Sequence, residues 1–247
     1  MIDVATQLET PGSAAQTPAS VVRTASVGKS IDGRTILRDV NIDVAAGQLV
    51  ALLGANGTGK STLLKVLATL VPPSTGQVEL FGKIATATSA DLRRRIGLIG
   101  HQSMLYHDLS ARENLEFFAR LYDVADVPAR AKQMLGMIGL ADRSEDPVRT
   151  FSRGMVQRVA IARALLHDPE LILADEPFDG LDAPSSESLE QLLSDLNLAG
   201  KTIVMVHHDI ETTLKIAERA IVLRDGRIAI DEPTMRLYPK EVLSEVY

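Results

Sequence analysis

Short runs of consecutive apolar residues recur along the chain, separated by segments with helical periodicity. A run of four or five apolar residues is typical of a strand buried on both faces of a parallel sheet. Such runs occur in LVALLG (49–54), RIGLIG (95–100), LILAD (171–175) and TIVMV (202–206). Helices are predicted over 61–70, 152–167, 185–198 and 209–220, and a final strand pair in IVLRDG and RIAI. This alternation predicts an α/β core built on a parallel sheet.

Two segments depart from this alternation. Short alternating stretches over 21–42, continued in QVELFG, predict an antiparallel β subdomain. Helical periodicity without strands over 110–140 predicts a helical subdomain inserted at about 103–165, in which Ser110 and Glu113 have the spacing of a capping box. Residues 1–20 are rich in Ala, Thr, Ser and Pro and are interpreted as a flexible tail. The chain is therefore expected to hold one domain, over 21–247.

Composition narrows the class of protein. The 247 residues are 45% hydrophobic and carry a net charge of −6, which argues against a nucleic-acid partner bound by a basic surface. The chain has no cysteine, and this excludes disulfides and thiolate metal sites. No uncharged apolar run reaches the roughly 20 residues that a membrane span needs, and no secretory signal is apparent. The expectation is a cytoplasmic protein without a membrane span.

The glycine-rich stretch GANGTGKST (54–62) joins the first buried strand to the helix after it. It fits the pattern G-x-x-x-x-G-K-[ST], in which backbone N–H groups converge on phosphate oxygens at a helix N-terminus. Lys60 is expected to bridge the β- and γ-phosphates of ATP, and Ser61 to offer its hydroxyl to Mg²⁺. The predicted nucleotide-binding residues are Gly54, Asn56, Gly57, Thr58, Gly59, Lys60, Ser61 and Thr62. A glycine-rich turn without a ligand is the alternative.

Two adjacent carboxylates, Asp175 and Glu176, follow the apolar run LILA. Charge at the end of a buried strand is costly unless it has a partner. The glycine-rich loop 54–62, as a phosphate cradle, provides the partner, because a nucleotide bound there brings Mg²⁺. Asp175, expected on a neighbouring strand, would hold this Mg²⁺ through water. Glu176 would polarise the water that attacks the γ-phosphate. A solvated turn after the strand is the alternative interpretation of the pair.

The segment FSRGMVQR (151–158) resembles the signature sequence of ATP-binding cassette (ABC) proteins, usually written LSGGQxQR. Phe151, Arg153 and Met155 depart from that pattern. The resemblance implies that Ser152 and Gly154 reach a γ-phosphate, by a hydroxyl and a backbone N–H at a helix N-terminus. A simple helix cap is the alternative for Ser152.

Other ABC motifs occur in the family's order, so the resemblance covers residues 21–247. It implies that Gln102 touches Mg²⁺ and senses the transport partner, and that Asp182 in FDGLD is the D-loop acid. In VMVHHDI it aligns His208 with the switch histidine that contacts the γ-phosphate, and leaves His207 as a structural neighbour. The family's adenine-stacking aromatic aligns with Ile31, and no aromatic residue occurs between Met1 and Phe81.

The resemblance also implies partners. Cradle and signature lie on opposite sides of an ABC domain, so two copies are expected to pair head-to-tail, most simply as a homodimer. Separate integral membrane subunits would dock on the segment 103–122, where Met104, Leu105 and Tyr106 are expected to be exposed. Leu115, Phe117 and Phe118 are expected in the core of the helical insert. The protein would then be peripheral, on the cytoplasmic face of the inner membrane.

The same segment, with GHQ before it and FSRGM after it, is similar to the ATP-binding subunit of the haem exporter of cytochrome c maturation. The hypothesis from the sequence is therefore an ATPase that powers haem export. ATPases of drug, lipid or polysaccharide exporters share the segment and are the first alternative. An ABC ATPase without a transport role is the remote one, since the single cassette leaves no room for long coiled coils or a DNA-binding domain.

Overall fold

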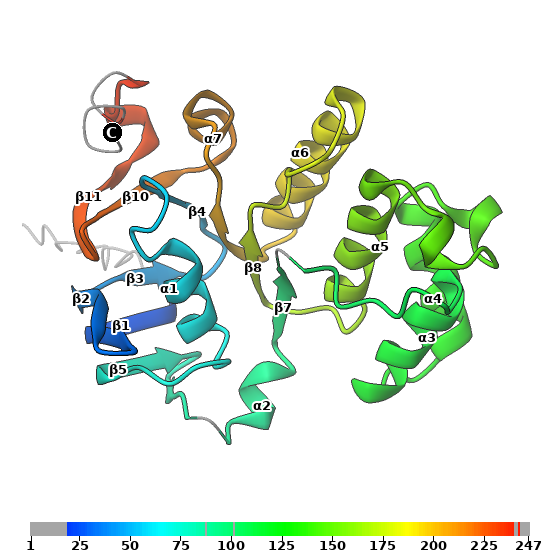
Figure 1. The fold of residues 1–247 in the computed structure, drawn as a ribbon, viewed down its shortest axis with the longest axis horizontal. Helices are drawn as coiled ribbons and strands as arrows, with labels where there is room; N and C mark the ends of the chain where they lie inside the picture. Colours follow the sequence, from blue (N-terminus) through cyan, green and yellow to red (C-terminus); the bar gives the residue numbers. More distant parts are fainter. Residues whose placement is uncertain (1–18, 87, 101, 240–241, 243–247) are drawn as a thin grey trace, which may run out of the picture.

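A six-stranded sheet forms the centre of the molecule (Figure 1). The computed structural model describes residues 19–86, 88–100, 102–239 and 242. The strand order is β11 (Arg227–Pro233), β10 (Arg219–Arg224), β4 (Leu49–Leu53), β9 (Thr202–Val206), β8 (Leu171–Asp175) and β7 (Ile96–Ile99). All neighbours pair in parallel except β10 and β11. Every residue of β4, β8 and β9 is buried, as their continuous apolar runs predict.

A second, antiparallel sheet lies beside the first. Its order is β2 (Arg34–Val40), β1 (Ser20–Ile31), β5 (Thr75–Leu80) and β6 (Lys83–Ile84), and β3 (Asp43–Ala45) also pairs with β1. Helix α1 (Lys60–Leu67) packs between the two sheets. One hydrophobic cluster joins all three layers: Leu63, Leu64 and Leu67 of α1, Val22 and Val78 of the antiparallel sheet, and Leu52 and Leu173 of the parallel sheet. Helix α1 is therefore fixed by both sheets.

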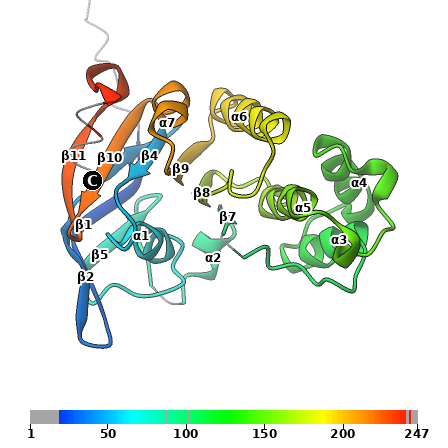
Figure 2. The same ribbon diagram turned by 45° about the horizontal axis from the view of Figure 1, so that its top comes forward.

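Three helices form an arm on one side of the parallel sheet: α3 (Ala111–Leu121), α4 (Val127–Met137) and α5 (Arg153–Leu165) (Figure 2). The short helix α2 (Ala90–Arg93) precedes β7, and 3₁₀ turns occupy Ala141–Arg143, Val148–Thr150 and Thr234–Arg236. The predicted capping box is confirmed, because Ser110 Oγ accepts the N–H of Glu113 and the Glu113 carboxylate accepts the N–H of Ser110. The first arm helix begins at Ala111, after an irregular stretch that starts near 103.

Two further helices cover the parallel sheet. Helix α6 (Ala183–Leu198) buries Leu189 and Leu193 in the same cluster as Ile203 of β9, and α7 (Ile210–Ile216) packs Ile210 near Leu53. The prediction of a helix over 209–220 is wrong over its last four residues, 217–220. That helix ends at Ile216, because residues from Arg219 onward enter β10 and pair with β4.

The α/β fold with an antiparallel sheet and a helical insert is confirmed. Nearly all of the proposed tail over 1–20 lies outside the described residues, and β1 already begins at Ser20. Among the described residues, none of the helices has the length and apolar character to cross a bilayer.

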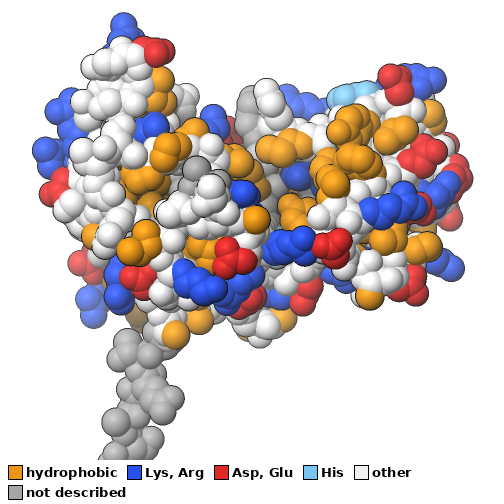
Figure 3. Space-filling model, turned by 90° about the horizontal axis from the view of Figure 1, so that it is seen from below, with side chains coloured by type: hydrophobic (Ala, Val, Ile, Leu, Met, Phe, Trp, Pro, Cys, Tyr) orange, Lys and Arg blue, Asp and Glu red, His pale blue; other side chains and the backbone are white. Residues whose placement is uncertain are grey.

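The segment before α3 is only partly exposed. Met104 and Tyr106 are exposed, the latter at 52%, but Leu105 is only 8% exposed, so its predicted place on the surface is wrong. Leu105 joins the cluster that fills the arm, which Leu115 shares. Figure 3 shows hydrophobic side chains gathered over the arm on the face seen from below. One part of the segment therefore serves the core and another is free for contact.

Candidate functional site

The loop between β4 and α1 surrounds the ammonium group of Lys60. Its Nζ donates hydrogen bonds to the carbonyl oxygens of Gly54 at 2.6 Å and Ala55 at 2.9 Å. Thr58 Oγ1 also donates to the Ala55 carbonyl. Burial lowers the pKa of Lys60, and the nearby carboxylates of Glu176 and Asp175 oppose this effect. The loop thus encloses a buried cation, the ammonium group of Lys60, at a place where an anion can bind.

Two positions of the loop exclude any side chain. Gly54 has a φ of 144°, and a Cβ there would lie 2.3 Å from the carbonyl oxygen of Leu223. Gly59 has a φ of 106°, and its Cβ would lie 2.7 Å from Leu37 Cδ2. The backbone is therefore pressed between β10 and β2 with its amides close to the start of α1. This shape fits a phosphate group.

A hydroxyl and a carboxylate meet across the fold. Ser61 Oγ donates a hydrogen bond of 2.9 Å to Asp175 Oδ1. The expectation that Asp175 lies on a strand neighbouring β4 is wrong, because β9 runs between β4 and β8. The contact forms nonetheless because α1 packs beside β8. Two hard oxygen ligands side by side match the chemistry of Mg²⁺, so the residues present fit that metal.

Glu176 follows directly after β8 with a φ of 51°, a left-handed conformation that is uncommon outside glycine. Its N–H donates to the carbonyl of Val206, which anchors the turn to the end of β9. The residue borders a cavity of about 250 Å³ that Gly54, Asn56 and His208 also line. The turn thus directs Glu176 toward the loop, and strained backbone of this kind is concentrated at functional sites.

The two histidines after β9 differ in environment. His208 is exposed, whereas His207 is 5% exposed, with its ring 4.7 Å from that of Phe178 and 5.0 Å from that of His208. Burial lowers the pKa of His207 to about 4, and the neighbouring His208 adds to the effect. His207 is packed as a structural residue, as expected, but it also lines the cavity beside Glu176.

The signature segment begins α5. Ser152 is the N-cap of this helix, and its Oγ accepts the N–H of Met155 at 3.3 Å, while its contact with a γ-phosphate stays a prediction. Gly154 is partly buried near Leu181. Arg153 forms an ion pair with Asp179, although it departs from the family pattern. This ion pair connects the variant signature to the segment that follows Glu176.

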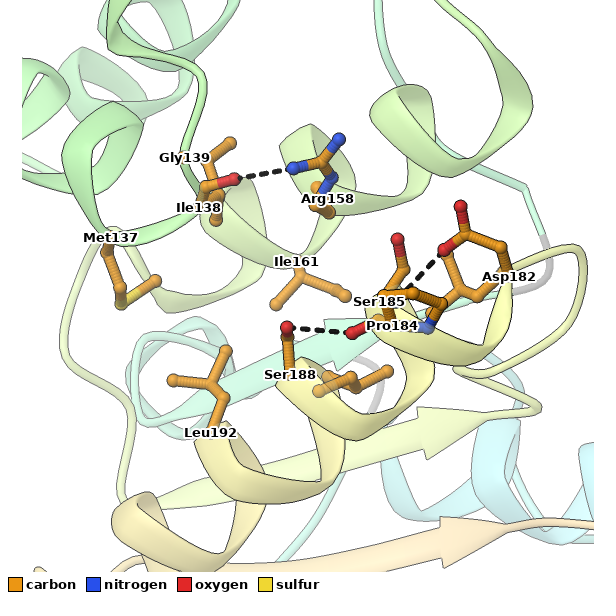
Figure 4. Close-up of a pocket in the computed structure, with 12 residues that line it drawn as sticks. Met137, Ile138, Gly139, Arg158, Ile161, Asp182, Pro184, Ser185, Ser188 and Leu192 are labelled. Carbon is orange, nitrogen blue, oxygen red and sulfur yellow. Dashed lines mark hydrogen bonds between the residues drawn. The ribbon is translucent and has the colours of Figure 1, made fainter.

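A further tie in this region is the hydrogen bond from Gln157 Nε2 to the Pro177 carbonyl, at 3.0 Å. Asp182 caps α6 by accepting the N–H of Ser185, and hydrogen bonding from the Ser185 side chain and then from this N–H lowers the pKa of Asp182. Figure 4 shows Asp182 at one side of a pocket of about 400 Å³ between α4, α5 and α6, opposite Arg158. Asp182 and Ser152 are therefore assembled apart from the phosphate loop.

Four predicted site residues have no direct role in this arrangement. Gln102 is exposed after β7 and, within the described residues, shows no hydrogen bond to Ser61 or Asp175. Ile31 is 45% exposed at the end of β1, where it pairs with Arg34. The remaining two are Gly57, exposed on the loop, and Thr62, half-buried in α1. Their functional roles remain predictions.

Some contacts of the site have no signal in the local sequence. The ion pair of Arg153 with Asp179 and the bond from Gln157 to Pro177 join motifs that are 26 and 20 residues apart. The position of His207 on the cavity wall depends on β9 ending beside the loop. Only the opposite charges of Arg153 and Asp179 offered a hint, and a charge pair at that separation is too common to predict a contact.

Comparison with known proteins agrees with this geometry. A family model described as ABC transporter matches residues 37–179, more than half of the chain. The ABC transporter ATP-binding protein NatA of Bacillus subtilis is 36% identical over 208 residues, which cover 83% of this chain and 85% of NatA. A fluoroquinolones export ATP-binding protein of Mycobacterium tuberculosis is 37% identical over 199 residues, covering 80% of this chain and 65% of that protein.

A solved structure, the dimeric ATP-binding cassette MJ0796 in a post-hydrolysis state with ADP and phosphate, superposes with a TM-score of 0.80. It is 33% identical and covers 88% of this chain and all of that one. Since the family is defined by its ATP-hydrolysing domain, the cofactors of this chain are ATP and Mg²⁺, and their binding by the loop, Ser61 and Asp175 stays a prediction. The chain therefore belongs to the ABC transporter family.

Proposed function

We propose that this chain is the ATP-hydrolysing subunit of an ABC exporter and works with separate membrane subunits. The observation that carries the proposal is the joined site at the ends of β4 and β8. There the Ser61 hydroxyl bonds to Asp175, and Glu176 shares a cavity with the phosphate loop and His208. A charged, partly buried acid beside an anion cradle is suited to hydrolysis rather than to binding alone.

The residues divide the work as follows. The loop amides and Lys60 bind the phosphates, and Ser61, Asp175 and Gln102 hold Mg²⁺. When bound, the metal neutralises charge on the phosphate oxygens. Glu176 orients a water and accepts its proton as the water oxygen attacks the γ-phosphorus and the bond to the β-phosphate oxygen breaks. His208, exposed at the cavity, contacts the γ-phosphate.

The second half of each ATP site comes from another copy of the chain. Ser152, Gly154 and Asp182 lie at the starts of α5 and α6, and no contact of theirs with the phosphate loop is seen among the described residues. A head-to-tail homodimer brings the signature of one copy over the ATP of the other. Support comes from the cassette MJ0796, whose structure is a dimer and which is 33% identical.

Membrane subunits dock on the arm in this proposal. The exposed Met104 and Tyr106 lie before α3, and the ring of Tyr106 packs against that of Phe117. An aromatic and apolar patch of this kind is typical of a protein contact. The protein then sits peripherally at the cytoplasmic face of the membrane, and Ile31 contacts adenine without a π-face.

The cargo is proposed to be a drug-like small molecule moved outward. A relative that is 37% identical exports fluoroquinolones, by its name. Haem export for cytochrome c maturation is the second candidate and rests on the resemblance of 103–122 with GHQ and FSRGM. The relatives reported above offer haem no support, so it ranks below a drug-like cargo.

One experiment tests the transport role and separates the two cargoes. The tagged chain is expressed in its host, and the complex is purified from detergent-solubilised membranes and reconstituted into proteoliposomes. We expect integral subunits to co-purify and a fluoroquinolone to stimulate the ATPase, whereas haem does not. Stimulation by haem alone would reverse the ranking. A chain that hydrolyses ATP but brings no membrane protein would contradict the exporter proposal.

A further inference from the structure

Strand β7 is the edge of the parallel sheet and leads into the loop that holds Gln102. The carbonyl of Arg95 bonds to the start of β8, so by alternation the carbonyls of Ile96 and Leu98 face the open edge. Carbonyls on an exposed edge need a partner. Helix α5 covers this edge (Figure 1), and two side chains from its carboxyl end meet both carbonyls.

The first contact comes from Arg163. Its Nη2 donates a hydrogen bond of 2.7 Å to the Leu98 carbonyl. The guanidinium carbon lies 5.4 Å from the ring centre of Phe118 on α3. Arg163 is 5% exposed, and within the described residues no carboxylate forms an ion pair with it. A buried arginine without an acid is costly for stability, and its hydrogen bond to the Leu98 carbonyl offsets part of this cost.

The second contact repeats the first about one helical turn further on. His167 lies just beyond the end of α5, and its Nε2 is 3.0 Å from the Ile96 carbonyl. Its ring stacks on Tyr122 with centres 3.8 Å apart and planes 7° apart. Phe118 and Tyr122 are four residues apart at the end of α3, as are Arg163 and His167 at the end of α5, and Tyr122 and His167 each lie beyond the last helical residue. Two parallel contacts thus run from α3 through α5 to β7.

The approach of α5 to β7 is close enough to exclude a side chain. A Cβ on Gly97, between the two bonded carbonyls, would lie 2.6 Å from the Ala164 carbonyl oxygen. Only glycine fits at this position, because the backbones of α5 and β7 are in close contact. A sliding of α5 along β7 would also break the hydrogen bonds of Arg163 and His167. Ser152 precedes α5, and α3 follows the exposed aromatic patch, so the signature and this patch are both connected to the strand that leads to Gln102.

We propose that Arg163 and His167 are positioning residues that clamp β7 to the arm and thereby set the place of Gln102 at the ATP site. The inference rests on the role of Gln102 in the proposed function. It gives a partner that docks near Tyr106 a packed connection, through α3 and α5, to the strand that leads to Gln102. Neither Arg163 nor His167 touches nucleotide.

A double-mutant cycle on the full chain tests the clamp. Gln102→Ala and Arg163→Met are each expected to lower kcat about tenfold at saturating Mg-ATP, with KM changed less than about twofold. If Arg163 acts through Gln102, the double variant loses no more than the single ones, whereas independent effects would multiply to about a hundredfold. Multiplied losses, or normal kcat in Arg163→Met, would overturn the inference.

Two companion variants separate positioning from general packing. Arg130→Met is the matched control: Arg130 also donates to backbone carbonyls, those of Leu165 and Leu166, but does not contact β7. Its kcat should stay within about twofold of the natural chain. His167→Gln retains an N–H donor for Ile96 and should keep more activity than His167→Leu. Thermal melts of all variants establish that each is folded.

The outcomes remain distinct from those of the proposed function. If Arg163→Met does not fold, His167→Gln and His167→Leu take its place, and each is combined with Gln102→Ala in the double-mutant cycle. Normal kcat in Gln102→Ala would overturn the clamp, while the assignment as an ATPase would still depend on Glu176. Loss of hydrolysis in Glu176→Gln with no effect at Gln102 would therefore leave the proposed function standing and the clamp refuted.

Discussion

At the scale of the residue, two adjacent acids differ because the backbone turns between them. Asp175 is the last residue of β8 and is buried beside Ser61, whereas Glu176 is partly exposed in a left-handed turn at the cavity. A buried carboxylate next to a hydroxyl is suited to a metal, and a partly exposed one to proton transfer. The proposed roles, a metal ligand for Asp175 and a base for Glu176, rest on this difference.

Replacing Glu176 by Gln should reduce ATP turnover at least about a hundredfold and leave nucleotide affinity within a few-fold, because the amide keeps the shape but cannot accept the proton. Turnover is measured by phosphate release, and affinity by titration with a fluorescent ATP analogue. Glu170→Gln, which alters a surface acid paired with Arg95, is the control. Near-normal turnover in Glu176→Gln would refute the role of the base.

Ile31 is exposed at the end of β1 and offers dispersion contact without a π-face. An aromatic ring in that place should add roughly 1 kcal/mol of stacking, so Ile31→Tyr should tighten ATP binding several-fold. Ile31→Leu is the control, since it changes shape without adding a ring. Titration of ATP and GTP against the three forms measures the effect. A natural chain that already discriminates strongly between the bases, unaltered by tyrosine, would show that another residue holds adenine.

His207 makes the folded chain sensitive to acid. Its folded pKa of about 4 is below the ordinary value of 6.5, so the unfolded chain binds the proton first as the pH falls. The stability present above pH 6.5 is lost as the pH drops toward 4, by about 2 kcal/mol at pH 5. Urea unfolding at pH 7.5 and pH 5 measures it. His207→Gln should lose less stability over that interval, and an equal loss in both would contradict the assignment.

At the scale of the element, the segment before α3 is held by its backbone and not by its exposed ring. Buried Asn114 accepts the N–H of Tyr106 and donates to its carbonyl, so the turn persists whatever side chain is present. The ring of Tyr106 packs edge-on to Phe117 at 5.1 Å and is half exposed. Recognition and folding thus depend on different atoms of one residue.

For this reason Tyr106→Asp should uncouple the membrane partner while basal ATPase activity of the isolated chain stays within about twofold. Co-purification with membrane subunits measures the first effect and phosphate release the second. Leu105→Asp is the contrasting variant, since Leu105 belongs to the core of the arm and its replacement should prevent folding. Should Tyr106→Asp itself unfold the chain, the ring would have to be counted as part of the core.

At the scale of the whole molecule, the phosphate loop and the signature belong to different parts of the fold, and among the described residues no hydrogen bond or ion pair joins them. The loop precedes α1 between the two sheets, and Ser152 begins α5 on the arm (Figure 2). The proposed site is therefore completed by a second copy.

The Glu176→Gln chain should sediment as a dimer when ATP is present and as a monomer without it. Adding Ser152→Arg to that chain should abolish the dimer but not ATP binding, because the signature acts on the partner's nucleotide. Asp142→Arg, an exposed change elsewhere on the arm, should leave the dimer intact. Analytical ultracentrifugation measures all three. A dimer that survives Ser152→Arg would contradict the head-to-tail arrangement.

The sequence by itself determined whatever depends on neighbours along the chain. The loop from Gly54 to Ser61, the capping box at Ser110 and the buried strands follow from spacing and periodicity, because backbone hydrogen bonds and side-chain period are local. For the same reason the acids Asp175 and Glu176 could be placed at the end of a strand before their surroundings were known.

Only the tertiary structure decided which distant segments meet. Ser61 reaches Asp175 across 114 positions although β9 runs between their strands, and Arg163 reaches Leu98 across 65. Packing against the sheet also ended α7 at Ile216 and buried Leu105. Strand order and helix packing are set by the summed burial of apolar surface over the whole chain, and no local pattern encodes that sum.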